Sequence, residues 1–295
     1  MKLEREKCMS SIFCLNAGNY AIEVLPAYGF SLVSFKHAGI ELLDCWDLAR
    51  FKGNSEDLAS ASKAPGPVFR KGFGPSIGPW FGGRFPGDNA FNHGVCRFAD
   101  WSANLETGPG FIRSRLNGSR EWLLDESLDE ICGFHLDVEI TYTLSEKGLS
   151  YSMENRSEGK KGTYGVHWYF MNPAGTRALM NVAPGRLLPD GKKEPLDPAF
   201  FSEEGGKTAA SLSFQGAYYL ENRFPIGPDE THAELHYPDG GRLSFRCSEA
   251  FFMTVLFCSG KFVCVEPVSG LPFRIGTFDK GTLTIVYSNP EQGAL

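Results

Sequence analysis

Apolar and polar residues alternate over long stretches of this sequence, and this pattern constrains the fold more than any other feature. In HLDVEITYTL (135–144), every second residue from Leu136 to Leu144 is apolar, and polar residues fill the positions between them. Because successive side chains of a strand point to opposite faces, the alternation predicts a strand with one buried face. The turn sequence SEKG follows, and LSYSMENRS then predicts the returning strand of a hairpin.

Similar hairpins are predicted at three other places. Asn117-Gly118 is a strong hairpin signal between two short strand-like runs, and Pro238-Asp239-Gly240-Gly241 and Ser259-Gly260-Lys261 each separate two alternating runs. A last strand is predicted over 281–288. Successive antiparallel hairpins without alternating helices favour an all-β fold, a large β-sandwich, over a βαβ fold.

The remaining segments suggest one domain. Short helices are predicted near 124–130 and 196–204, and long loops over 50–80 and 171–210, where glycine and proline are frequent. Large all-β folds often use a chain of this length for a single domain, and we see no linker or internal repeat. We therefore expect one β-sandwich domain over residues 1–295.

Charge and cysteine content exclude some classes of function. The net charge of −6 argues against nucleic acid as a partner, because phosphate neutralisation needs a basic face. The charged N-terminus lacks the apolar core of a signal peptide, and the apolar run at 251–257 is too short to span a bilayer. The 8 cysteines include no C-x-x-C pair, which is typical of reduced, buried thiols. We expect a cytoplasmic protein without a membrane partner.

Two residues in buried-looking strands are candidates for acid–base chemistry. Glu266 follows the apolar run FVCV, where an apolar environment disfavours a charged carboxylate, and Pro267 is expected to end the strand. The alternative is a strand-end glutamate that turns toward solvent. His167 lies within the apolar and aromatic run TYGVHWYFMNP (163–173), where a core-edge histidine bonded to a backbone carbonyl is the more ordinary interpretation.

The loop GGRFPGDNAFNHGVCRFADW (82–101) holds a third candidate, His93. Arg84 and Arg97 flank it, and Trp80 lies just before the loop. His93 could equally be a donor that stabilises the loop, and the arginines could be surface charges with packed stems. Tryptophan and phenylalanine at such positions belong more often to a core than to a ligand platform.

Together these pieces resemble a known family. HGVCR, YGVHWYF and VCVEP occur in the same order as the HG, H-x-Y-F and E-P motifs of the aldose 1-epimerase (galactose mutarotase-like) family. Residues 20–44 are similar to that family's opening strands, and GRLLPDG (185–191) is more loosely similar to a mid-domain loop. The resemblance thus extends from about residue 20 to residue 288.

The resemblance implies a β-supersandwich with a cleft across one sheet, and interconversion of the α and β anomers of a sugar. It implies that His167 is the general acid on the ring oxygen and that Glu266 takes the proton of the anomeric hydroxyl. His93 and Arg84 would hold the sugar, and neither a metal nor a cofactor is implied. Trp80 or Trp168 could stack on the C–H face of the sugar.

The chain departs from the family's pattern at three places, one of which is Trp168, where the family commonly has proline. Gly94 is followed by Val95, Cys96 and Arg97, an HGxxR form that resembles the hexose-6-phosphate mutarotase-like branch, in which Arg84 and Arg97 would suit a phosphate. The family's sugar-binding aspartate has no clear counterpart here, and Asp229 is the nearest candidate.

Other functions stay open. A non-catalytic carbohydrate-binding or regulatory module would need the cleft but no matched acid and base. A metal-dependent cupin is disfavoured because the sequence contains no H-x-H and its six histidines are widely spaced. The expected partner is a small sugar or sugar phosphate, and the expected state is a monomer or homodimer.

Overall fold

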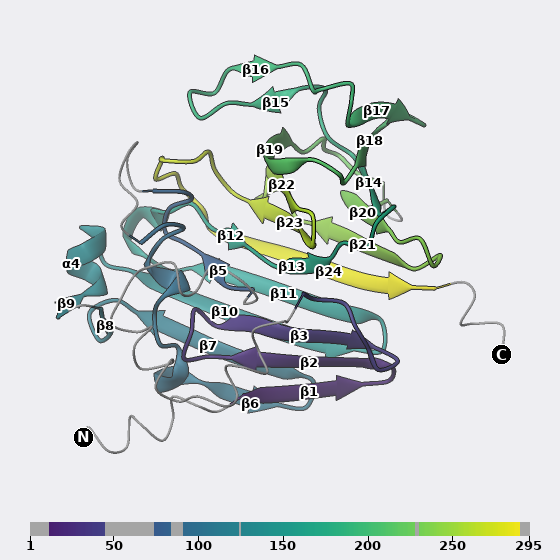
Figure 1. Ribbon diagram of the computed structural model, residues 1–295. Coiled ribbons are helices and arrows are strands. Elements are labelled where there is room, and N and C mark those ends of the chain that lie inside the picture. Colours follow the sequence, from purple (N-terminus) through teal and green to yellow (C-terminus); the bar gives the residue numbers. More distant parts are fainter. Residues whose placement is uncertain (1–11, 45–73, 84–90, 124, 228–229, 290–295) are drawn as a thin grey trace.

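The computed structural model describes residues 12–44, 74–83, 91–123, 125–227 and 230–289. Nearly all of the regular structure in these ranges is antiparallel β-sheet, as the alternation predicts. The largest sheet has ten strands (Figure 1). In sheet order, they are β17 (Phe201–Glu204), β18 (Lys207–Ser211), β14 (Arg177–Met180), β20 (Ala233–His236), β21 (Arg242–Cys247), β24 (Lys280–Ser288), β11 (Gly148–Asn155), β10 (Asp137–Ser145), β7 (Phe111–Asn117) and β6 (Glu106–Gly108).

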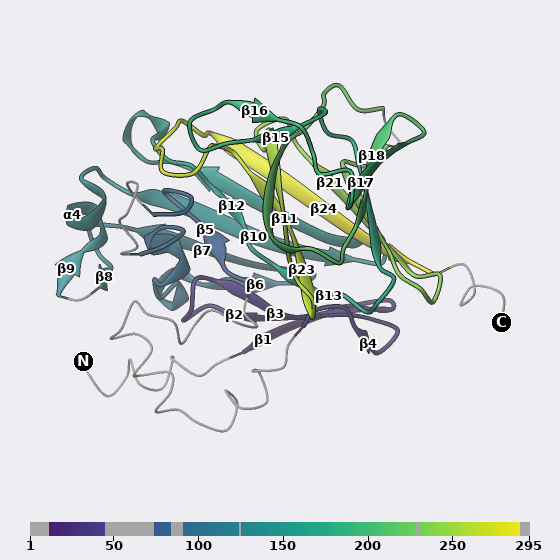
Figure 2. The ribbon, with the colours of Figure 1, turned by 45° about the horizontal axis from the view of Figure 1, so that its top comes forward.

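Two smaller sheets lie over one face of the ten-stranded sheet (Figures 1 and 2). The first contains, in sheet order, β19 (Gln215–Glu221), β22 (Met253–Ser259), β23 (Phe262–Val268), β12 (Gly165–Val166) and β5 (Ser76–Ile77), and β13 (Tyr169–Met171) also pairs with β23. The second contains β1 (Phe13–Ala17), β2 (Tyr20–Leu25), β3 (Ser31–His37) and β4 (Ile40–Glu41). The architecture is therefore a β-sandwich.

The core fills the space between these layers. The alternating apolar residues of β10 are buried, as the pattern predicts, and Tyr142 and Tyr151 are fully enclosed. Their hydroxyls donate hydrogen bonds across the layers, from Tyr142 to the carbonyl oxygen of Phe30 at 2.9 Å and from Tyr151 to Ser76 Oγ at 3.1 Å. These bonds satisfy polar groups that would be costly to bury alone, and they fix one layer against the other.

Most of the predicted hairpins are confirmed, but the one at Asn117-Gly118 is wrong. The strand β7 pairs with β6 and β10, whereas β8 (Trp122–Leu123) pairs with β9 (Glu126–Ser127) in a separate ribbon. The Asn117 side chain accepts the backbone N–H of Ser119, and Gly118 donates to the carbonyl of Leu136. The Asn-Gly pair thus ends β7, which pairs with β6 and β10 rather than with the run that follows.

The prediction for 171–210 is also corrected. This segment contains the short strands β14, β17 and β18 and the ribbon of β15 (Arg186–Leu187) and β16 (Lys193–Glu194). The helix expected at 196–204 is absent from it, because β17 occupies its second half. A short helix, α4 (Leu128–Cys132), does form near the other expected position. Ser127 and Glu130 build a capping box at its start.

The six described cysteines are all free thiols, and all but Cys14 are buried. The remaining two, Cys8 and Cys45, lie outside the described residues. In the part of the chain that the structure describes, no helix has the length and apolar composition needed to cross a membrane.

One buried histidine of the scaffold makes the stability depend on pH. His232 is buried, and its Nδ1 accepts the backbone N–H of Cys247 at 3.1 Å. Burial, together with a smaller effect of the nearby Arg246, lowers the pKa of His232 from 6.5 to about 4. Between these values the unfolded chain binds a proton that the folded chain does not. We therefore expect stability to be full above pH 6.5 and to fall by up to about 3 kcal/mol as the pH drops to about 4.

Urea denaturation of the wild type and His232→Asn between pH 7.5 and 4.5 tests this prediction. Asparagine keeps an oxygen acceptor for the Cys247 N–H but does not titrate in this range. The variant should lose less stability on acidification than the wild type. Equal losses would show that His232 does not carry the effect.

Candidate active site

A cavity of about 950 Å³ opens on the face of β23 that points away from the core. Aromatic side chains, among them Phe81, Tyr219 and Phe257, form part of its wall, and His93, His167 and Glu266 lie in the same wall. A mostly apolar cavity with a few polar groups is typical of a small-molecule site.

Strand parity places Glu266 in this wall. In β23, Val263 and Val265 pack into the main core, so the side chains of Phe262, Cys264 and Glu266 emerge on the opposite face. The strand continues through Pro267, which pairs with Thr254, and ends at Val268. The expectation that Pro267 stops the strand is therefore wrong. Glu266 is only 2% exposed, which also excludes a glutamate turned toward solvent.

The same parity places His167. Val166, Trp168 and Phe170 are buried in the main core, so His167 and Tyr169 face the cavity. Backbone pairing also aligns His167 with Glu266. Gly165 pairs with Val268 and Tyr169 with Cys264, so His167, midway between β12 and β13, falls opposite Glu266. Cross-strand neighbours of this kind lie within side-chain contact.

The distance between the two side chains agrees with this alignment. His167 Nε2 lies 3.3 Å from Glu266 Oε1. The backbone N–H of His167 donates to the carbonyl oxygen of Pro75 at 3.1 Å, which anchors the segment. A buried acid and a buried base thus meet on one wall of the cavity.

His93 is held by its own backbone and by its ring. Its N–H donates to the carbonyl of Gly82 at 2.7 Å, and its carbonyl accepts the N–H of Gly78 at 3.0 Å. The N–H of Gly82 points at His93 Nδ1 over 3.3 Å. Because Nδ1 is an acceptor there, the neutral ring carries its proton on Nε2. The ring meets that of His167 edge-on, with centroids 5.2 Å apart.

Burial sets the protonation of the acid–base pair. It raises the pKa of Glu266 well above its usual value, against the opposing charge of Arg97. Burial, together with a smaller effect of the charge of Arg97, lowers the pKa of His167 from 6.5 to about 3. Both directions favour neutral groups, so the pair shares one mobile proton between Oε1 and Nε2. Wherever this proton lies, the net charge of the pair is zero.

Arg97 and Asp44 supply opposite charges to the same cavity. Arg97 is 8% exposed and lines the wall beside the acid–base pair. Asp44 lines it too, and its backbone N–H donates to the carbonyl of Tyr169 at 2.8 Å. The sequence reasoning missed Asp44 because it precedes all three motifs. The sequence feature that could have indicated it is an acidic residue directly after the apolar pair Leu42-Leu43.

Of the other predicted binding residues, Arg84 and Asp229 lie outside the described residues. Trp80 and Trp168 are both buried in the main core rather than in the cavity wall. The indole N–H of Trp80 donates to the carbonyl oxygen of Phe91 at 3.0 Å. The expectation that either tryptophan stacks on a ligand is therefore corrected, and Phe81 and Tyr219 are among the rings that line the cavity instead.

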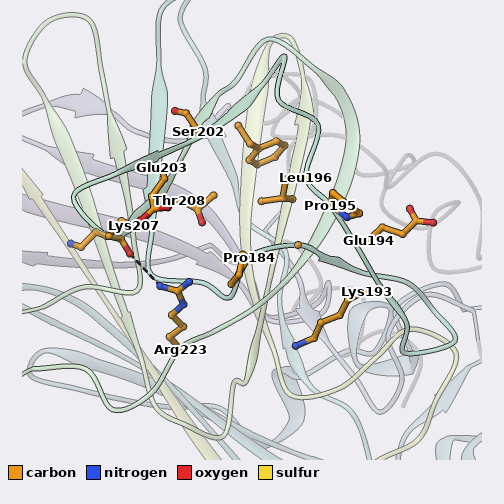
Figure 3. A pocket seen from close by; sticks show the side chains of 13 residues that line it. Pro184, Lys193, Glu194, Pro195, Leu196, Ser202, Glu203, Lys207, Thr208 and Arg223 are labelled. Atoms are coloured by element: carbon orange, nitrogen blue, oxygen red, sulfur yellow. Dashed lines mark hydrogen bonds between the residues drawn. The ribbon is translucent and has the colours of Figure 1, made fainter.

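A second cavity, of about 500 Å³, lies between the β15–β16 ribbon and strands β17 and β18 (Figure 3). The guanidinium of Arg223 at its edge donates to the carbonyl oxygen of Gly206 at 3.2 Å. Lys193, which also lines it, forms an ion pair with Glu221. Among its described lining residues there is no histidine. The histidine–carboxylate pair lies instead in the cavity beside β23.

No protein-family model and no curated protein matches this sequence. Solved structures do match its fold. The Slr1438 protein of Synechocystis sp. PCC 6803 has a TM-score of 0.68 and 16% identity, covering 95% of this chain and 96% of that one. A galactose mutarotase-like protein of Lactobacillus casei has a TM-score of 0.67 and 16% identity over 94% and 100% of the two chains. Galactose 1-epimerase of Lactobacillus acidophilus has a TM-score of 0.61 and 14% identity over 93% and 92%.

Proposed function

We propose that this chain, which has the galactose mutarotase-like fold, is an aldose 1-epimerase that interconverts the α and β anomers of a hexose or hexose phosphate. The observation that carries the proposal is the placement of His167 Nε2 3.3 Å from Glu266 Oε1 on the wall of a cavity large enough for a sugar. Opening a hemiacetal ring needs a base and an acid at the same carbon, and this pair supplies both.

In this mechanism, the sugar enters between the two side chains and replaces their direct contact. With the shared proton on His167, the Glu266 carboxylate takes the proton of the C1 hydroxyl while His167 gives its proton to the ring oxygen. The bond between C1 and the ring oxygen breaks, and a C1 carbonyl forms. Rotation about C1–C2 presents the other face of the carbonyl, and the two residues reverse their roles to close the ring.

The charge balance of the site suits this cycle. Ring opening converts a Glu266 carboxylate and a His167 imidazolium into a neutral acid and a neutral imidazole, so the net charge of the cavity does not change. Charge is costly to create in an apolar wall. Burial raises the pKa of Glu266, and the charge of Arg97 opposes this and so favours the carboxylate that the first step needs.

The charges of the cavity support a polar substrate. Arg97 and Lys261 both line it, and together they would suit the phosphate of a hexose phosphate. The aromatic rings of Phe81 and Tyr219 would cover the C–H face of the sugar.

His93 is proposed to orient the sugar by donating from Nε2. We expect His93→Asn to lower kcat/KM by about 10- to 100-fold, mainly through a higher KM, because one hydrogen bond to substrate is lost. Asparagine tolerates the positive φ of 71° at this position and can keep an acceptor for the N–H of Gly82. Steady-state kinetics with the fastest substrate measure the split. A fall in kcat at constant KM would contradict an orienting role.

The rival interpretation is a carbohydrate-binding module that does not catalyse. Anomer exchange measured by NMR on glucose, galactose and their 6-phosphates separates the two. Acceleration above the buffer rate supports the epimerase and identifies its substrate class. Sugar binding without acceleration on any member of the panel would favour the module.

A further inference from the structure

The acid–base pair has a third neighbour that the proposed mechanism does not use. Cys264 lies two residues before Glu266 on the same face of β23 and pairs with Tyr169 across the sheet. One ligand atom from each of His167, Cys264 and Glu266 lies within 4.8 Å of the other two. All three residues are buried.

We propose that His167, Cys264 and Glu266 form a binding site for a zinc-like divalent cation, and that this cation inhibits the enzyme by occupying its acid and its base. The inhibition rests on the proposed function, whereas the binding does not. Imidazole nitrogen, thiolate and carboxylate are the ligands that Zn²⁺ takes in proteins. Harder cations such as Mg²⁺ avoid thiolate, so the donor set selects for zinc-like ions.

The geometry allows a tetrahedral ion with small movements. Zinc–ligand bonds of about 2.0–2.3 Å place the ligand atoms roughly 3.3–3.8 Å apart. His167 Nε2 and Glu266 Oε1 already meet this spacing, at 3.3 Å. The wider separations in the cluster would close by about 1 Å of side-chain movement. His167 and Glu266 line the cavity, so the ion can arrive from there and keep its fourth position toward the cavity.

The charge balance also permits the ion to bind in a buried place. The neutral Glu266–His167 pair gives up its shared proton, and the Cys264 thiol gives up another, both to solvent. One thiolate and one carboxylate then neutralise the two charges of the cation. Burial and the neighbouring Glu266 raise the pKa of the Cys264 thiol, so the thiolate forms only as the cation displaces its proton.

Two spectroscopic titrations test the binding directly. Co²⁺ added to the purified protein should produce the charge-transfer absorption of a cobalt–thiolate bond, and Zn²⁺ should remove it. Cys264→Ala should abolish the band, and so should Cys264→Ser, which keeps the side-chain volume but supplies no thiolate. Cys258→Ala is the matched control, because that buried thiol lies on the neighbouring strand and instead donates to the carbonyl of Leu212. Absence of the band in the wild type, or its persistence in Cys264→Ala, would overturn the site.

The inhibition is tested on the fastest substrate of the NMR panel. Cys264→Ala should exchange anomers at nearly the wild-type rate without metal. It should need at least about 10-fold more Zn²⁺ for half-inhibition, since even partners of metal ligands contribute 10- to 100-fold in affinity. Equal Zn²⁺ sensitivity of the two proteins would overturn the inhibitory role. If no sugar is exchanged at all, the proposed function fails, and the cobalt titration still decides the site.

Discussion

Glu266→Gln should lower kcat for anomer exchange by about 10³-fold or more while leaving the fold intact. The amide has the same shape as the carboxyl but cannot accept the proton of the C1 hydroxyl. General acid–base groups contribute about 10² to 10⁴-fold each, and here one residue serves as the base for ring opening and as the acid for ring closure.

The same substitution should not destabilise the protein. Glu266 is buried, and burial already raises the pKa of its carboxyl toward the neutral form. A neutral amide removes the cost of burying a charge and can still contact His167. We therefore expect a melting temperature equal to or above that of the wild type, measured by circular dichroism.

Glu139→Gln is the matched control for activity. Glu139 lies on β10, where it forms an ion pair with Arg156 and does not line the cavity beside β23. This variant should exchange anomers within about twofold of the wild type. If Glu266→Gln kept more than a tenth of the wild-type rate above buffer, Glu266 would not be the base.

Gly94→Ala should lower the free energy of unfolding by about 2–5 kcal/mol, the largest effect on stability that we expect. Gly94 has a φ of +82°, which alone costs a side chain roughly 1–2 kcal/mol. A Cβ there would also lie 2.0 Å from the carbonyl oxygen of Gly78, a backbone atom that cannot rotate away. Overpacking of this kind adds about 1–3 kcal/mol.

The clash falls on the segment that holds His93. The carbonyl oxygen of Gly78 accepts the N–H of Cys96 at 2.9 Å, and the N–H of Gly78 donates to the carbonyl of His93 at 3.0 Å. Moving the backbone at Gly78 away from the segment of His93 and Cys96 would lengthen both hydrogen bonds. The close approach of the backbones at Gly94 and Gly78 thus requires glycine in the HG motif. We also expect the folded fraction of the variant to bind sugar weakly.

Gly39→Ala measures the cost of the positive φ without the steric clash. Gly39 has nearly the same φ, +81°, but a Cβ there would meet nothing within 4 Å. Urea denaturation should show a cost of about 1–2 kcal/mol for this variant. Equal costs for the two variants would mean that the approach of Gly94 to Gly78 is not a constraint.

The sequence alone determined the strands and the side of each strand that a residue occupies. Alternation in 135–144 predicted the buried face of β10, and the turn signals at 238–241 and 259–261 placed two hairpins correctly. The same parity already separates Val166 and Trp168 from His167, and Val265 from Glu266. These features are local, because a strand's pleat alone decides them.

Predictions from local sequence were wrong where the same residue types can serve more than one structural role. Asn117-Gly118 suits a hairpin but here ends β7, which pairs with β6 and β10 rather than with the run that follows directly. Trp80 and Trp168 have flat rings of the kind that stack on sugars, yet both are packed in the hydrophobic core. Pro267 has no N–H to donate, yet β23 continues through it and pairs it with Thr254.

Only the tertiary structure decided that His167 and Glu266 meet. They lie far apart in the sequence, and their contact depends on β12, β13 and β23 pairing in one register. A shift of one residue would turn Glu266 toward the core and leave His167 without a partner. That register is fixed by which apolar residues fill the space against the ten-stranded sheet, a property of the whole sandwich that no single segment of the sequence contains.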